Sequence, residues 1–181
     1  MDATALIRSL MEGAPGAHVE EAPSVDGQPT VFVEPADLLA VLKIVRDAPA
    51  LRFSCLADLT AADFWPREPR FEVVYHFLSI ELGQRLRVKV RLAGADAHVA
   101  SAASIWPAAQ WLEREVWDLF GVAFDDHPDP RRLLMPEDWE GHPLRKDYPV
   151  QIRMTPRTSE PMQVTEAEFR ANLQRDRLSR R

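Results

Sequence analysis

The segment FEVVYHFLSIELGQRLRVKVRL, residues 71–92, decides the fold because it holds two strand patterns joined by a short turn. Its first part is rich in aromatic and β-branched residues, which favour a central strand. Its second part alternates between apolar side chains and cations, as a strand with one buried face does. The apolar members are Leu86, Val88, Val90 and Leu92. With Gly83 at the turn, the segment predicts a hairpin that covers a hydrophobic core.

Helical patterns flank this hairpin on both sides. Residues 35–47 begin with Pro35 in the first turn and carry an apolar face from Leu38 to Val45. The run PAAQWLEREVWDLFG, residues 107–121, predicts a second helix between Pro107 and a left-handed cap at Gly121. Its predicted apolar stripe comprises Leu112, Val116 and Leu119.

Three weaker elements complete the predicted domain: a helix over residues 2–12 and strands over residues 31–34 and 52–60, with residues 13–29 as a loop. The order of the elements predicts an α+β fold in which helices pack on one face of a single sheet.

Regular structure fades after Gly121. Seven of the fifteen prolines fall between Pro128 and Pro161, and each removes a backbone donor. Apolar residues punctuate this run, and such a segment lies along a surface, its own or a partner's. We therefore predict an α/β domain over residues 1–122, an irregular proline-rich docking arm over 123–163 and a basic C-terminal tail over 164–181. Thr165 and Glu168 are spaced as a capping box for a helix in that tail.

Composition narrows the class of function. The net charge is −6, which argues against a dedicated nucleic-acid binder. Residues 145–181 nevertheless hold nine Lys and Arg against five Asp and Glu, which fits either a solvated tail or an arm on an acidic partner. The one cysteine excludes a disulfide within the chain and Cys-based zinc or Fe–S sites. No segment approaches the ~20 apolar residues of a membrane helix, so we expect membrane contact only through partners.

Chemical motifs are sparse. His127 and His142 lie beside aspartates, but their spacing matches no established zinc pattern, and no phosphate-binding glycine loop occurs. On the helix, Glu113 and Glu115 point about 200° apart and cannot share a proton. Arg114 and Asp118 are spaced for an i,i+4 ion pair on a polar helix face. A metal-dependent enzyme using His127, His142 and the nearby aspartates stays open as an alternative.

A basic cluster with an aromatic residue favours binding over catalysis. Arg131, Arg132, Arg145 and Lys146 surround Trp139, and Arg and Trp are enriched at binding hot spots. Proline-fixed backbone also loses less entropy on docking. We therefore interpret the chain as an interaction module rather than an enzyme.

Three motifs carry a family resemblance: FEVVYHFLSI, WLEREVWDLFGVAFDDHPDPRRLL and DWEGHPLRKDYP. In this order and spacing they resemble the thirty-kilodalton subunit family of respiratory complex I, the proton-translocating NADH–quinone oxidoreductase, over roughly residues 30–150. The resemblance implies a scaffold subunit with no catalytic, cofactor-binding or metal-binding residues of its own. FMN, Fe–S clusters and quinone are then expected in partner subunits.

The resemblance also implies which subunits are the neighbours. They are a subunit of the forty-nine-kilodalton type, onto which the arm wraps, and a small Fe–S subunit, and these two together form the quinone pocket. We call the first of them the quinone-site subunit. The assembly is then a hetero-oligomer that is peripheral on the cytoplasmic side of the bacterial inner membrane. Relatives of the family serve membrane-bound hydrogenases and other ferredoxin-linked complexes, and this alternative stays open.

The residues expected at the partner interface come from the helix over residues 107–121 and from the arm. They are Glu113, Arg114, Glu115, Asp118, His127, Arg131, Arg132, Trp139, His142, Arg145, Lys146, Asp147 and Tyr148.

Overall fold

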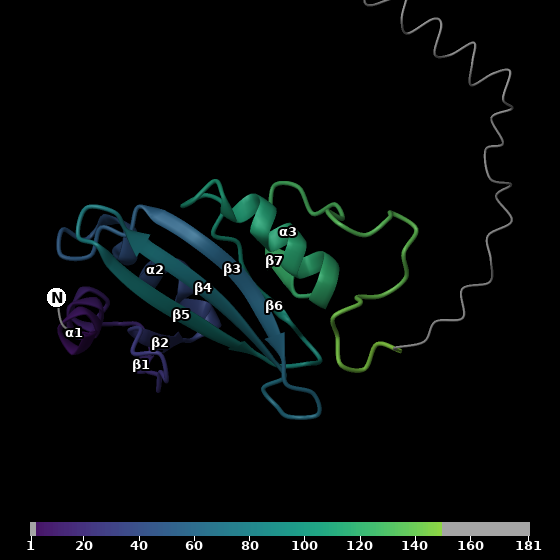
Figure 1. Cartoon of the computed structure of the whole chain (residues 1–181), viewed down its shortest axis with the longest axis horizontal. Helices are drawn as coiled ribbons and strands as arrows, with labels where there is room; N and C mark the ends of the chain where they lie inside the picture. The colour runs from purple at the N-terminus through teal and green to yellow at the C-terminus, as the bar shows by residue number, and fades with distance from the viewer. Residues whose placement is uncertain (1–2, 150–181) are drawn as a thin grey trace, which may run out of the picture. The chain divides into compact units, whose positions relative to one another are not determined.

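A five-stranded mixed sheet organises the computed structural model, which describes residues 3–149 (Figure 1). The spatial order is β1–β2–β5–β4–β3, with β2 and β5 parallel and the other neighbours antiparallel. The strands are β1 (Val19–Glu21), β2 (Thr30–Val33), β3 (Cys55–Asp63), β4 (Phe71–Ser79) and β5 (Gln84–Leu92). The predicted tail, including the Thr165 capping box, lies outside the described residues.

The predicted hairpin forms the middle of this sheet, as β4 and β5. Its register places apolar residues opposite one another on the inner face, in the pairs Phe71–Leu92, Val73–Val90, Tyr75–Val88 and Phe77–Leu86. All eight are buried, while the cations of β5 lie on the opposite face. A register slip by one residue would expose the whole set, so the alternation fixes the pairing.

Three helices supply the other half of the core. They are α1 (Ala3–Gly13), α2 (Leu38–Asp47) and α3 (Ala109–Phe120). Apolar side chains from all three join one cluster with the inner face of the sheet. In Figure 1 the ribbon of α2 lies behind the sheet, and α3 runs beside β3, against which it packs. The predicted α+β class with helices on one face is confirmed.

The structure differs from the predicted elements in short pieces. Residues 13–29 contain β1, and β6 (His98–Ala100) pairs in parallel with β7 (Ala123–Asp125) in a second, two-stranded sheet. Each of these strands has three residues, too few for an alternating pattern to be recognised. A 3₁₀ turn, Pro35–Asp37, precedes α2, and α3 begins two residues after Pro107.

The buried side of α3 also differs from its predicted apolar stripe. Its buried residues are Ala109, Glu113, Val116 and Asp118, whereas Leu112 and Leu119 are partly exposed. Val116 is buried as predicted and Leu112 packs against the core, but the prediction missed that two carboxylates of the helix are buried beside them. Both acids are hydrogen-bonded there, which compensates for the loss of water.

Candidate docking surface and the network beneath it

Asp118 on α3 holds the backbone of the segment that follows β7. Its side chain is fully buried, and Oδ1 accepts a hydrogen bond from Arg132 Nη1 at 2.6 Å. Three successive backbone N–H groups donate to Oδ2, those of Leu133, Leu134 and Met135, at 3.0, 2.7 and 2.8 Å. One carboxylate therefore fixes a four-residue stretch of the predicted arm onto the helix.

The charge of Asp118 is maintained by these bonds. Burial would raise its pKa, but the Met135 N–H, the Arg132 guanidinium and the two other N–H groups outweigh that effect and lower the pKa. The predicted Arg114–Asp118 ion pair is wrong, because Asp118 pairs with Arg132. Arg114 turns toward the arm, where it donates to the carbonyls of Arg131 and Arg132 at 3.0 and 2.9 Å.

Glu113, five residues earlier on α3, is bonded to a different segment, the residues that follow β6. Ser101 Oγ donates to its carboxylate at 2.6 Å and the Ala102 N–H at 2.7 Å, both from the segment after β6. Burial raises the pKa of Glu113 to about 7, although these two hydrogen bonds oppose the shift. Glu113 is therefore an internal contact between α3 and the residues that follow β6.

His127 lies next to this carboxylate and is bonded through both ring nitrogens. The Asp129 N–H donates to Nδ1 at 3.0 Å, so Nε2 carries the hydrogen and donates to the Gln110 carbonyl at 3.0 Å. Nε2 is 3.8 Å from the Glu113 carboxylate. His127 therefore anchors the beginning of the arm to the beginning of α3.

The segment GHPLR, residues 141–145, caps the C-terminal end of α3. Helix ends leave carbonyls without partners, and those of Asp118, Leu119 and Phe120, with that of the capping Gly121, find donors in this segment. The bonds are His142 Nδ1 to Asp118 O (3.0 Å), Leu144 N–H to Leu119 O (3.0 Å), Arg145 Nε to Phe120 O (2.5 Å) and Arg145 Nη2 to Gly121 O (3.1 Å). Burial lowers the pKa of His142, which favours the neutral ring.

Gly121 makes this cap possible. Its φ of +72° is the left-handed conformation predicted for the helix end. A Cβ there would overlap the ring of His142 and would lie 2.5 Å from Arg145 Nη2. Position 121 therefore requires glycine, because its backbone is left-handed and a side chain would clash with His142 and Arg145.

Arg70 ties the far end of the described arm to the sheet. Its guanidinium donates to both carboxylate oxygens of Asp63, at 2.9 and 2.8 Å, and to both of Asp147, at 3.1 and 2.6 Å. The Lys146 N–H adds a bond of 2.8 Å to Asp63. Burial opposes ionisation of Asp63, but the bonds from Arg70 and the backbone N–H groups hold its pKa at about 2.

Asp63 and Arg70 were missed by sequence reasoning. They stand at the facing ends of β3 and β4, and their partner Asp147 is 77 residues farther along the chain than Arg70. No local pattern signals such a contact. The sequence pattern indicates that β3 ends near Asp63 and that β4 begins after Arg70. It does not indicate that the two side chains bond each other.

The predicted interface residues divide into two groups. Most of them are buried or partly buried and bond to this chain's own backbone or side chains. Those exposed are Glu115, Arg131, Lys146 and Asp147. Trp139 stacks against Tyr148, with ring centroids 6.4 Å apart. Whether any of the thirteen contacts a partner stays a prediction.

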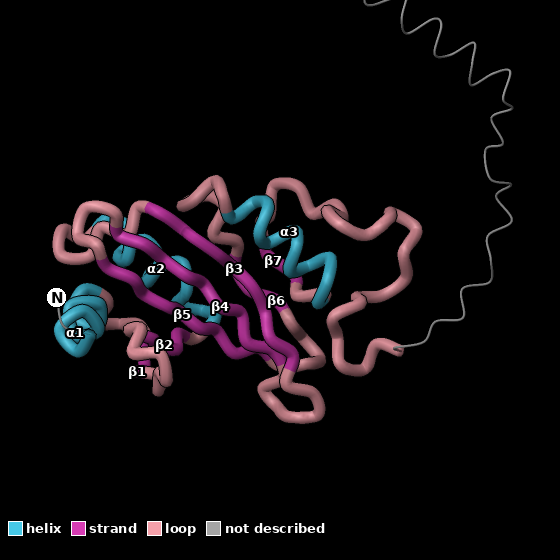
Figure 2. The backbone as a smooth tube through the Cα atoms, viewed as in Figure 1, coloured by secondary structure: helices cyan, strands magenta, loops and turns pink. Residues whose placement is uncertain are grey.

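Large apolar side chains are exposed over the same elements. Trp111 on α3 and Leu134 on the arm are each 60% exposed, and Leu144 is 49% exposed. We call these three residues, with the exposed Glu115 and Arg131, the docking face. Figure 2 shows the irregular chain after β7 running past α3, where the bonds described above hold it.

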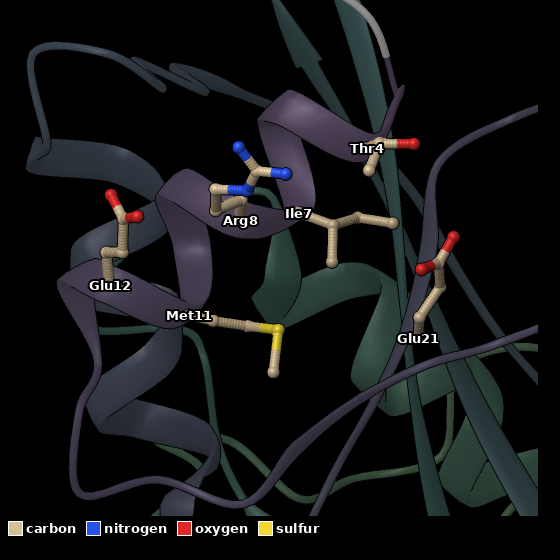
Figure 3. Close-up of a pocket in the computed structure, with 6 residues that line it drawn as sticks. All are labelled: Thr4, Ile7, Arg8, Met11, Glu12 and Glu21. Carbon is tan, nitrogen blue, oxygen red and sulfur yellow. The ribbon is translucent and has the colours of Figure 1, made fainter.

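Other parts of the described chain give less support for a functional site. Among residues 3–149, no three His, Cys, Asp or Glu side chains converge as metal ligands would. A pocket on α1 and β1 is lined by Thr4, Ile7, Arg8, Met11, Glu12 and Glu21, none of which belongs to the predicted interface (Figure 3). Within the described part of the chain, no helix has the length and hydropathy to cross a membrane.

Comparison with known proteins gives consistent matches. The sequence model described as "Respiratory-chain NADH dehydrogenase, 30 Kd subunit" matches residues 31–153. The C subunit of the NADH-quinone oxidoreductase of Citrifermentans bemidjiense is 50% identical over 125 residues, which cover 69% of this chain and 76% of that protein. The protein of the same name from Roseiflexus sp. is 42% identical, with 83% and 86% covered.

Two solved structures are also similar. A trypsin-resistant fragment of Nqo5 aligns with a TM-score of 0.56 and 28% identity, covering 71% of this chain and 99% of the fragment. A chain of a membrane-bound sulfane sulfur reductase, described as an archaeal respiratory membrane complex, aligns with a TM-score of 0.67 and 28% identity, covering 83% and 87%.

Proposed function

The chain belongs to the family of the "30 Kd subunit" of the respiratory-chain NADH dehydrogenase, and from this premise we propose that it is a non-catalytic scaffold subunit of a proton-translocating NADH–quinone oxidoreductase. In this proposal it docks on the quinone-site subunit, which forms the quinone pocket with the small Fe–S subunit. Its relatives are named as subunits of NADH-quinone oxidoreductase, a multi-subunit enzyme, which supports a hetero-oligomer.

The observation that carries the proposal is that the polar groups of α3 and of the arm form hydrogen bonds within this chain, while apolar side chains stay exposed. The charged groups of Asp118 on α3 and of Arg132 and Arg145 on the arm form hydrogen bonds within this chain, mainly with backbone carbonyls and N–H groups. Trp111, Leu134 and Leu144 remain exposed. A fixed backbone that presents apolar side chains loses little conformational entropy on binding, which suits a permanent protein interface.

In this assignment the redox groups belong to the partners. FMN, Fe–S clusters and quinone reside in neighbouring subunits, and this chain positions the quinone-site subunit. Asp118, Arg132 and Arg145 are engaged in bonds to its own groups, so they act by shaping the arm, whereas Glu113 joins α3 to the residues that follow β6. The chain is placed on the cytoplasmic side of the membrane and reaches it only through its partners.

A second candidate is the equivalent subunit of another respiratory membrane complex, hydrogenase-like or ferredoxin-linked. The similarity to a chain of the sulfane sulfur reductase supports it. The relatives at 42–50% identity carry the NADH-quinone oxidoreductase name, so the NADH-linked enzyme is favoured.

The test is purification of the native complex through an affinity tag on this chain, followed by identification of its subunits. We expect the quinone-site subunit, the small Fe–S subunit and an NADH-oxidising flavin subunit. Hydrogenase subunits in place of the flavin subunit would select the second candidate, and a chain purified alone would refute both.

The docking face has its own variant. Leu134→Asp places a charge in the proposed interface and should release the quinone-site subunit. Ile80→Asp, in the turn after β4, is the matched control because Ile80 is 69% exposed and is not one of the residues of the docking face. Full assembly of Leu134→Asp with lost turnover would instead place chemistry in this chain.

A further inference from the structure

Two neighbouring aromatic side chains are exposed in the loop between β3 and β4. Phe64 is 40% exposed and Trp65 is 52% exposed. We call residues 64–69 the aromatic loop. Exposed aromatic side chains leave much apolar area in water, and tryptophan is strongly enriched among residues that dominate binding energy. This pair therefore calls for an explanation beyond the folding of the chain itself.

The backbone of the aromatic loop is held in place from several directions. Asp63 Oδ1 accepts from the Trp65 N–H at 2.9 Å, and the Phe64 N–H donates to the Arg70 carbonyl at 2.8 Å. Glu68 accepts from the N–H groups of Arg70 and Gly94, at 3.1 and 3.0 Å. The aromatic side chains are thus presented on a preformed turn, which lowers the entropy lost on binding.

The charges around the aromatic pair are unbalanced. Asp63 and Glu68 are engaged by Arg70 and by backbone N–H groups. Arg67 and Lys146 are exposed, and neither makes an ion pair with any of residues 3–149. The surface is therefore two aromatic side chains bordered by two cations that have no ion-pair partner within residues 3–149, on a chain whose net charge is −6.

The aromatic loop is continuous with the arm. The Trp65 and Lys146 N–H groups donate to the two oxygens of one carboxylate, that of Asp63. Arg70 joins the same carboxylate to Asp147. The exposed Leu144 precedes Lys146 by two residues, so the aromatic loop extends the surface that the arm presents.

From these features we propose that Phe64 and Trp65, flanked by Arg67 and Lys146, form a second anchor for the protein partner. The anchor fits an apolar pocket on that partner whose rim carries carboxylates. The inference rests on the proposed function for the identity of the partner and adds both the residues of a second contact and the chemistry of the surface that receives it. Arginine at such a rim favours bidentate pairing with carboxylates.

The experiment uses the tagged full-length chain purified with its complex across a series of salt concentrations. In Phe64→Ala/Trp65→Ala, retention of the quinone-site subunit should weaken about tenfold or more, as for central aromatic contacts. In Arg67→Glu/Lys146→Glu, retention should be lost at low salt, whereas Arg67→Lys/Lys146→Arg should keep it. Ile80→Ala, in the turn at the other end of β4, is the matched control for an exposed apolar side chain.

The outcomes separate this inference from the proposed function. If the native chain carries no quinone-site subunit, the proposed function fails. If Leu134→Asp releases that subunit while both loop variants retain it fully, the proposed function stands and the second anchor is refuted.

The last measurement is binding of the chain to vesicles of phosphatidylglycerol and phosphatidylcholine. Binding to them that depends on Trp65, together with full retention of the partner, would assign the loop to a lipid surface and overturn the proposal. An unchanged melting temperature for each variant shows that the exposed substitutions leave the fold intact.

Discussion

The sheet with α1 and α2 differs from residues 126–149 of the arm in the forces that hold it. The first is held by apolar burial: Tyr75, Phe77 and their neighbours pack with almost no exposed area. Residues 126–149 contribute no buried apolar residue to that core. They are held by charged side chains that bond backbone groups, chiefly Asp118, Arg132 and Arg145.

This difference shows how a chain can fix an irregular segment without giving it a core of its own. The prolines of the arm prevent the regular helix and strand patterns through which most of the core is buried. A buried carboxylate instead collects several N–H groups, and a guanidinium collects several carbonyls. The apolar side chains of the arm then stay available for a partner. Substitutions in the apolar core and substitutions of the charged side chains separate the two mechanisms of stabilisation.

The largest effect is expected from the apolar core. Phe77→Ala removes a ring that packs between Tyr75 and Trp106, whose centroids lie 6.1 and 4.7 Å away. Truncations of this kind cost about 3–5 kcal/mol, because a cavity remains. Thermal or urea unfolding should show a large loss in global stability with the arm and sheet unfolding together. A loss below about 1 kcal/mol would mean that this core is not the main source of stability.

The second effect is a pH dependence located at Glu113. Its folded pKa of about 7 lies above the ordinary value of 4.5, so the folded protein binds more protons than the unfolded chain between these values. The stability that Glu113 contributes is complete below pH 4.5 and is lost as the pH rises toward 7. The loss is on the order of 3 kcal/mol, from about 1.4 kcal/mol for each unit. Urea titrations at several pH values measure it.

Glu113→Gln supplies the comparison, because it removes the titration, keeps one oxygen to accept from the Ala102 N–H, and turns an amide NH2 toward the Ser101 hydroxyl, which can accept from it. The stability of this variant should vary less between pH 4.5 and 7 than that of the native chain. Asp63, with a lowered pKa of about 2, acts with the opposite sign and at lower pH, since its stabilisation is lost as the pH falls from about 4 to 2. An unchanged profile in the Gln variant would assign the pH dependence to another group.

The third effect is confined to the arm. Asp118→Asn removes the charge that receives Arg132 and the three N–H groups but keeps one acceptor oxygen, so we expect a total loss of about 1.5–3 kcal/mol. Limited proteolysis or hydrogen exchange should show faster opening of residues 126–149, with a smaller change in the global melting temperature. Glu115→Gln, an exposed acid on the same helix, should change stability by less than about 0.5 kcal/mol. Equal protection of the arm in both variants would contradict the role of Asp118.

The fold follows from the sequence wherever a period is long enough to read. The alternation over β5 gives the strand, its buried face and its register with β4, and Gly121 gives the end of α3. The three-residue strands and the 3₁₀ turn carry no such period. They form because neighbouring elements bring their backbones together.

The sequence predicts the candidate site less completely than the fold, for a physical reason. Sequence reasoning treats an acid on a helix as a solvent-facing residue, yet Glu113 and Asp118 are buried because their partners arrive from segments 11 to 17 residues away. The pairing of Arg70 with Asp147 spans 77 residues. Residue type indicated the polar cluster, but which polar groups face one another depends on tertiary contacts that no local pattern encodes.

The smallest effect is expected at the cap of α3 and tests which property of Arg145 matters. Arg145→Lys keeps a cation beside the helix C-terminus but loses the fork that reaches the carbonyls of Phe120 and Gly121. The loss should be about 1 kcal/mol, measured as faster exchange of the amides of residues 142–148. Arg145→Ala removes both properties and should lose more. If the two variants exchange equally fast, the charge near the helix end contributes nothing, and Arg145 acts only through the geometry of its two hydrogen bonds.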